Sequence, residues 1–174
     1  MTTRTGPAQG DHRIESRDDL IAVFAKGEKS RDAWRIGTEH EKFVYRRADH
    51  RAPSYDEPGG IGALLTAMTR FGWQPVEERG KIIALTGPDG AVSLEPAGQL
   101  ELSGAPRAHL HETCAEAGRH LEQVKTIGDE LGIGFLGLGM WPDKRRDELP
   151  IMPKGRYEIM LRHLSLIHIS SPRD

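Results

Sequence analysis

Apolar residues recur at helical spacing in two segments of the first half of the chain. In the first segment, Ser16 can cap a helix that places Asp19 at its third position and ends at Gly27. Its apolar stripe consists of Leu20, Val23 and Phe24. The second segment runs from Gly59-Gly60 to Gly72, and its apolar stripe consists of Ile61, Leu64, Leu65 and Met68. Both patterns predict helices that bury these stripes.

The longest helical pattern lies between His109 and Leu131 and is terminated by Gly132. Its apolar positions step by four and three and comprise Leu110, Cys114, Ala117, Leu121, Val124, Gly128 and Leu131. Cys114 lies on this face. Because the sequence arranges no base around it, a small buried core thiol is favoured over a catalytic nucleophile.

Five further segments have the apolar patterns that are typical of strands. They span residues 35–45, 81–85, 91–95, 99–103 and 133–140. The sequence Gly87-Pro88-Asp89-Gly90 lies between two of them and is typical of a tight hairpin turn, which predicts antiparallel pairing there. The order of helices and strands predicts an α+β fold with a mainly antiparallel sheet.

Length and charge narrow the choice of partners. A chain of 174 residues is long enough for one domain with its own core. Its formal net charge of -2 offers no positive excess for nucleic acid or an anionic membrane, and no stretch approaches the ~20 apolar residues of a spanning helix. Cys114 is the one cysteine, and the N-terminus lacks the apolar core of a signal peptide. We therefore expect a cytoplasmic protein without a disulfide.

Two carboxylates lie two residues apart in the segment GTEHEK, which spans residues 37–42. On a strand, this spacing places Glu39 and Glu41 on the same face. The flanking apolar residues indicate a partly buried strand, where like charges repel unless solvent or a cation lies between them. A hard cation at these two carboxylates is the sharper hypothesis.

A second acidic pattern occupies residues 93–103. Gln99, Glu101 and Ser103 alternate with leucines, so the polar set shares one face of a strand. Glu95 precedes a Pro-Ala-Gly break that can act as a bulge and turn its side chain toward the same site. If both acidic segments belong to one sheet, their four glutamates converge as oxygen ligands for Mg²⁺ or Mn²⁺. By spacing alone, a half-exposed strand is the commoner explanation of such alternation.

A proline-bounded loop between Trp141 and Tyr157 is rich in cations. These are Lys144, Arg145, Arg146, Lys154 and Arg156. Arginine suits carboxylates and phosphates, although a solvated basic loop explains the pattern equally well. Nucleic acid is disfavoured as a partner, because only Trp141 and Tyr157 offer rings on which bases can stack.

Several longer motifs, taken in order, resemble the plant and proteobacterial type of glutamate–cysteine ligase. They are RIGTEHEKF, SLEPAGQLELSGAP, LHETCAEAGRHLEQVK, LGIGFLGLGMWP and PIMPKGRYEIM, and the resemblance covers about residues 14 to 164. It implies an antiparallel sheet that forms a cradle, related to the fold of glutamine synthetase, with acidic metal ligands on the inner face. The length of these motifs reverses the preference for a merely half-exposed strand.

The resemblance also implies the reaction and its residues. The metal ligands implied for Mg²⁺ or Mn²⁺ are Glu39, Glu41, Glu95 and Glu101, and the implied substrate contacts are Gln99, Arg156 and Tyr157. The implied ligase uses ATP to phosphorylate the side-chain carboxylate of L-glutamate. The amine of L-cysteine then attacks the γ-glutamyl phosphate, in the first step of glutathione biosynthesis. Such chemistry requires no nucleophile from the protein.

Residues 1–15 are polar and carry no periodic apolar pattern, so we expect a loose arm there. The resemblance implies the N-terminal part of the ligase catalytic domain over 16–164 and a non-native tail over 165–174. The chain by itself is accordingly expected to be inactive. Two alternatives stay open, namely a related carboxylate–amine ligase with another amine acceptor and a non-catalytic anion-binding module that uses the basic loop.

Overall fold

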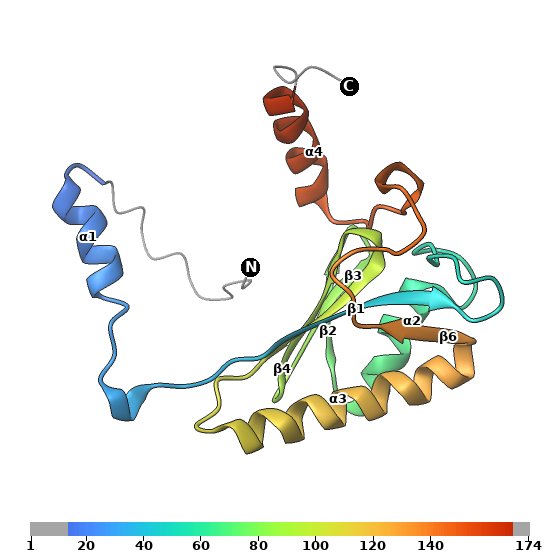
Figure 1. Ribbon diagram of the computed structural model, residues 1–174, viewed down its shortest axis with the longest axis horizontal. Coiled ribbons are helices and arrows are strands. Elements are labelled where there is room, and N and C mark those ends of the chain that lie inside the picture. Colours follow the sequence, from blue (N-terminus) through green and yellow to red (C-terminus); the bar gives the residue numbers. More distant parts are fainter. Residues whose placement is uncertain (1–13, 169–174) are drawn as a thin grey trace.

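A six-stranded antiparallel sheet organises the computed structural model, which describes residues 14–168 (Figure 1). The strands are β1 (Glu39–Arg46), β2 (Gln74–Glu78), β3 (Lys81–Gly87), β4 (Gly90–Glu95), β5 (Gln99–Gly104) and β6 (Ile133–Leu136). They lie in the order β2-β3-β4-β5-β1-β6, and each neighbouring pair is antiparallel. The expected α+β fold with a mainly antiparallel sheet is confirmed. The relationship to glutamine synthetase stays a prediction.

Four α-helices and four short 3-10 helices accompany the sheet in the described residues. The α-helices are α1 (Arg17–Ala25), α2 (Ile61–Met68), α3 (Leu110–Leu131) and α4 (Gly155–His168). The 3-10 helices span Arg31–Ala33, Thr69–Phe71, Pro96–Gly98 and Arg146–Glu148. Within residues 14–168, none of these helices combines the length and the apolar character that a membrane crossing requires.

The main core lies between one face of the sheet and the helices α2 and α3. The sheet contributes Val44, Leu85, Val92, Leu94, Leu100 and Leu102, all fully buried. The predicted stripe of α2 is confirmed, because Ile61, Leu64, Leu65 and Met68 are also fully buried. Burying each such side chain contributes about 1.5–3 kcal/mol. This core fixes which face of the sheet is apolar and therefore leaves the opposite face for polar side chains.

The predicted apolar stripe of α1 is wrong, although the helix itself forms as expected. Ser16 and Asp19 make the predicted capping box. However, Leu20, Val23 and Phe24 are all exposed, and α1 stands apart from the sheet (Figure 1). An apolar stripe can be buried only where another element lies against it, and the described residues place none on α1.

The buried face of α3 also differs from the prediction. Its buried positions are Thr113, Glu116, His120, Val124, Ile127 and Gly128, whereas Leu110, Cys114 and Leu121 are exposed. The expectation of a buried Cys114 thiol is therefore wrong. Two of the polar side chains that are buried in the first half of α3 have charged partners, because Glu116 accepts from Arg107 and His120 lies against Lys42. An apolar pattern cannot reveal such a face.

Several strand boundaries were also misjudged from the sequence. β1 begins at Glu39 rather than at residue 35, and Ile36 forms only an isolated bridge to Arg107. β6 ends at Leu136 rather than at residue 140. β2 was not expected, since Pro75 interrupts its pattern. Residues 1–13 of the predicted arm lie outside the described residues, and so do residues 169–174 of the predicted tail. Helix α4 ends at His168 and therefore extends past the boundary expected at residue 165.

The predicted hairpin is confirmed, and charged side chains fasten its turn to α3. Gly87 pairs with Gly90 across the turn. Asp89 accepts hydrogen bonds from Arg107 Nη2 at 2.6 Å and from Arg119 Nη2 at 2.7 Å. Arg107 also donates to the buried carboxylate of Glu116 at 2.7 Å. This network fixes the β3–β4 turn against the first half of α3.

We expect Asp89→Asn to lower the free energy of unfolding by about 1–2 kcal/mol near neutral pH, because the pairs are partly exposed. The hydrogen bond from Arg119 is the main cause that lowers the pKa of Asp89 below 3.8. A lowered pKa in the folded state stabilises the protein above the ordinary value, and this contribution is lost as the pH falls through the lowered value. Urea titrations of both proteins at pH 7 and pH 3 should therefore show a difference that shrinks in acid.

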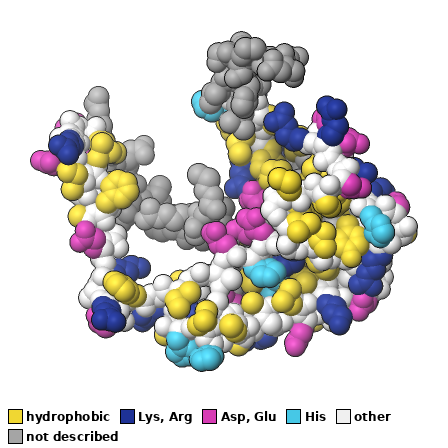
Figure 2. All heavy atoms as spheres, in the orientation of Figure 1, with side chains coloured by type: hydrophobic (Ala, Val, Ile, Leu, Met, Phe, Trp, Pro, Cys, Tyr) yellow, Lys and Arg dark blue, Asp and Glu magenta, His cyan; other side chains and the backbone are white. Residues whose placement is uncertain are grey.

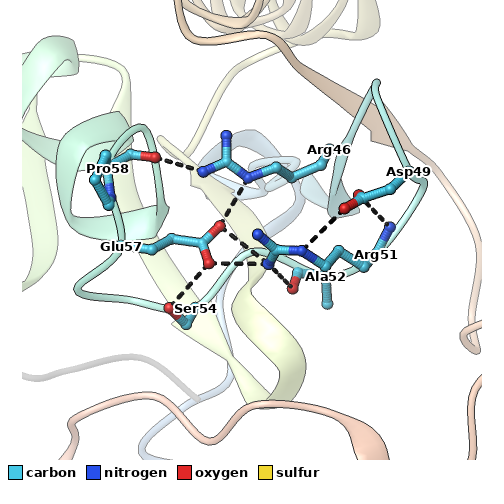
Figure 3. Close-up of polar contacts among 7 residues, drawn as sticks. All are labelled: Arg46, Asp49, Arg51, Ala52, Ser54, Glu57 and Pro58. Carbon is cyan, nitrogen blue, oxygen red and sulfur yellow. Dashed lines mark hydrogen bonds and ion pairs between the residues drawn. The ribbon is translucent and has the colours of Figure 1, made fainter.

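A second charged network lies at the C-terminal end of β1 (Figure 3). Glu57 accepts hydrogen bonds from Arg46 Nε at 2.8 Å and from Arg51 Nη1 at 2.9 Å, and Arg51 also binds Asp49. Burial alone would raise the pKa of Glu57, but the hydrogen bonds from Arg51 and Arg46 outweigh it and lower the pKa. The network ties the end of β1 to the segment that leads into α2.

Candidate functional site

The strand register brings all four predicted metal ligands onto one face of the sheet. Glu41 lies opposite Glu101, and Glu39 lies opposite Ser103, across β1 and β5. Glu95 lies opposite Gln99 across β4 and β5. Directly opposed residues point to the same side of a sheet, so this side, the acidic face, carries Glu39, Glu41, Glu95, Gln99 and Glu101. Figure 2 shows a group of acidic side chains in the hollow between α1 and α4.

Hydrogen bonds hold the central carboxylates of the acidic face in place. Glu101 is buried, with 4% of its surface exposed. It accepts hydrogen bonds from Ser103 Oγ at 2.9 Å and from Ser93 Oγ at 3.3 Å. Glu41 is exposed and accepts one from Gln99 Nε2 at 2.8 Å. Each of these carboxylates therefore keeps acceptor capacity for a further ligand.

The predicted substrate contacts on α4 lie at the edge of this face. Arg156 Nη2 donates to Glu95 Oε1 at 2.6 Å. Tyr157 is buried, and its hydroxyl donates to the carbonyl oxygen of Leu94 at 3.0 Å. Burial raises the pKa of the Tyr157 hydroxyl. The structure thus brings Arg156 to the acidic face, whereas it uses the polar atom of Tyr157 to anchor α4 on β4.

The basic loop does not form one continuous cationic patch. Lys144 pairs with Asp143, and Arg145 pairs with Asp147, both within the loop. Lys154 is buried and donates to the Leu94 carbonyl. Burial lowers the pKa of Lys154 to about 8, and the neighbouring charge of Arg156 acts in the same direction. Since Lys144, Arg145 and Lys154 are each engaged by a different partner, the loop offers little support for an anion-binding module.

The carboxylates do not form a complete metal cage. Among residues 14–168, no three His, Cys, Asp or Glu side chains lie close enough together to hold a metal ion. Mg²⁺ usually keeps several waters and takes only one or two protein carboxylates together with substrate phosphates. The opposed pair of Glu41 and Glu101 fits this mode of binding, in which the chain supplies part of the ligand set.

Sequence reasoning missed two polar residues that lie beneath the acidic face. Lys42 is 1% exposed and His120 is 2% exposed, and Lys42 Nζ lies 2.9 Å from His120 Nε2. The available signal was a lysine at an inward-facing position of β1, between Glu41 and the apolar run that follows. Ser93 belongs to one of the sequence motifs, but its hydrogen bond to Glu101 depends on the β4–β5 register and could not be foreseen from the sequence.

Comparison with known proteins identifies the family of this chain. The model of glutamate-cysteine ligase family 2 matches residues 35–169. The chain is 51% identical over 150 residues to the chloroplastic glutamate–cysteine ligases of Brassica juncea and Arabidopsis thaliana, and 47% identical to glutamate–cysteine ligase A of Oryza sativa subsp. japonica. These alignments cover 86% of this chain but only 28–30% of the relatives. The chain thus spans less than a third of their length.

One expectation is corrected by the same comparison, and one is confirmed. The names of these relatives describe chloroplastic proteins, which contradicts the expected cytoplasmic location. That expectation rested partly on a single cysteine, which argues against a disulfide framework without distinguishing one reducing compartment from another. The resemblance that the motifs suggested is confirmed over most of the chain. The chain belongs to glutamate-cysteine ligase family 2.

Proposed function

We propose that this chain forms part of an ATP-dependent ligase that joins the side-chain carboxylate of L-glutamate to the amine of L-cysteine. Relatives that are about half identical to it are named for this activity. The observation that carries the proposal in the structure is the pairing of Glu41 with Glu101 on a polar face of the sheet. Two opposed carboxylates are suited to an enzyme that must bring the phosphates of ATP beside another carboxylate.

Glu41 and Glu101 would hold Mg²⁺ or Mn²⁺, with Glu39 and Glu95 as further oxygen donors on the same face. A bound divalent ion neutralises charge on the transferring phosphoryl group. Ser93 and Ser103 hold the Glu101 carboxylate in place before substrates arrive, because both hydroxyls already donate to it. Such prior ordering reduces what binding must later supply.

Arg156 is suited to contact the carboxylate of an amino-acid substrate or a phosphate, because a guanidinium binds such groups with two parallel hydrogen bonds. Glu95 already orients it across the edge of the acidic face. Gln99 orients Glu41 through its amide and is placed to contact a substrate from the same side. Tyr157 would act mainly by fixing α4, and hence Arg156, against β4.

A chimeric ligase tests the proposal. The matching 150-residue segment of the Brassica juncea protein would be replaced by that of this chain. The purified chimeric ligase should form γ-glutamylcysteine from ATP, Mg²⁺, glutamate and cysteine, as detected by mass spectrometry. Parallel reactions with other amines would test the acceptor. If a folded chimera yields no product while the Brassica protein does so in the same assay, the proposal is wrong. If the chimeric ligase prefers another amine, the proposed acceptor, L-cysteine, is wrong.

A further inference from the structure

A buried ammonium lies on the opposite side of the sheet from the acidic face. Lys42 follows Glu41 in β1 and pairs with Leu100, while Glu41 pairs with Glu101. The Lys42 side chain therefore points toward α3, away from the two carboxylates. Its ammonium is enclosed by the core, because only 1% of the residue is exposed. The proposed reaction assigns no role to this buried charge.

Three acceptors surround the ammonium, which has three protons to donate. Lys42 Nζ donates to the carbonyl oxygen of His40 at 3.0 Å, to that of Leu100 at 3.4 Å and to His120 Nε2 at 2.9 Å. These acceptors belong to β1, β5 and α3. The ammonium thus ties together the two strands that carry Glu41 and Glu101 and the helix that supports them from below.

The protonation states follow from the surroundings. Burial lowers the pKa of His120 to about 3, and the adjacent charge of Lys42 acts in the same direction. His120 is therefore neutral near pH 7, and its Nε2 accepts from Lys42. Its proton then lies on Nδ1, which is buried and has no hydrogen-bond partner. Burial also lowers the pKa of Lys42 to about 8, against the opposing effect of Glu101 and Glu41. The three acceptors around Nζ match the three protons of an ammonium.

Stability alone does not explain this arrangement. Removing an ammonium from water costs several kcal/mol, and replacing buried ionic groups by apolar side chains of similar volume is often neutral or stabilising. The unpartnered Nδ1 of His120 adds a further cost. What the arrangement supplies is a fixed positive charge beneath two carboxylates that would otherwise repel each other.

We propose that Lys42, held by His120, is a positioning residue that keeps the Glu41 and Glu101 carboxylates side by side on the acidic face before a divalent cation and ATP bind. The inference rests on the proposed ligase function. Without the ammonium, mutual repulsion separates the two carboxylates and loosens β1 against β5. A cation must then draw them together, which weakens its binding because the site is no longer preorganised.

Lys42→Met in the chimeric ligase tests this role, because methionine fills a similar volume without the charge or its three hydrogen bonds. We expect the Mg²⁺ concentration at half-maximal rate to rise about tenfold and kcat/KM for ATP to fall about tenfold. The variant should remain folded, as a cooperative thermal unfolding transition would show. A purely electrostatic effect has the opposite sign, since removing a positive charge attracts Mg²⁺ more strongly. An unchanged or lowered Mg²⁺ requirement in a folded, active Lys42→Met protein would therefore overturn the proposal.

Variants of the partner provide a second, independent test. His120→Leu removes the acceptor and should raise the Mg²⁺ requirement several-fold, whereas His120→Gln restores an acceptor and should recover most of the loss. Thr113→Val is the matched control, because Thr113 is buried on the same helix and its hydroxyl has no partner. Equal Mg²⁺ requirements for Leu and Gln at position 120 would contradict the proposal, even if Lys42→Met does not fold. An inactive parent chimera would instead refute the ligase function.

Discussion

Glu101→Gln in the chimeric ligase is expected to lower turnover about 100-fold or more while leaving the fold intact. Glutamine has nearly the same size, and its amide oxygen can still accept from Ser103. It lacks the negative charge that a divalent cation requires from a ligand in this position. The loss should therefore appear in kcat and kcat/KM together, as for an interaction that acts mainly in the transition state.

Initial rates at saturating ATP and several Mg²⁺ concentrations would measure this effect, with Glu41→Gln as the companion variant. Glu130→Gln is the matched control, because Glu130 is an exposed carboxylate on α3 that pairs with Arg70. It should retain the parental rate. Near-normal turnover of Glu101→Gln at limiting Mg²⁺ would show that Glu101 is not a metal ligand.

Gly90→Ala should be the most destabilising substitution of the hairpin that carries β4. Gly90 has a φ of +107°, which side chains rarely tolerate, and an added Cβ would overlap the carbonyl oxygen of Ser103 in β5. Because that atom belongs to a paired strand, relief requires β4 and β5 to separate. We expect a loss of about 3–5 kcal/mol in the free energy of unfolding, from backbone strain and overpacking combined.

Gly80→Ala provides the comparison for this effect. Gly80 lies in the β2–β3 turn with a φ of +74°, but an added Cβ would meet nothing within 4 Å. Alanine there should cost only the backbone strain, about 1–2 kcal/mol. Urea denaturation of the parent protein, Gly90→Ala and Gly80→Ala would separate the cost of backbone strain from the cost of overpacking. Similar losses for both variants would show that the close approach of β4 to β5 at Ser103 is not maintained in solution.

Local patterns in the sequence determined most of the secondary structure. The spacing of Ile61, Leu64, Leu65 and Met68 was sufficient for α2, because one apolar stripe at helical period has only one way to face a core. The Gly-Pro-Asp-Gly turn likewise specified the β3–β4 hairpin, since its residues favour a tight reversal. Alternation within residues 99–103 separated the leucines from Gln99 and Glu101, and the core confirms that separation.

The acidic site was only partly predictable. Period-two spacing placed Glu39 and Glu41 on one face of a strand, and the long motifs indicated the family. Neither could establish that Glu41 lies opposite Glu101, because this depends on β5 pairing with β1, which is distant in sequence. The link between Arg156 and Glu95 similarly joins α4 to β4 across the fold.

The sequence by itself therefore determined the α+β class, the hairpin and the acidic motifs, because each depends on neighbours within a few residues. Only the tertiary structure decided which face of α3 is buried, as the exposed Cys114 and the buried His120 show. Burial depends on what packs against a segment, and a charged partner such as Lys42 can make a polar position an interior one. The pairing of β1 with β5 belongs to the same category, because contacts between distant segments are decided by the packing of the whole chain.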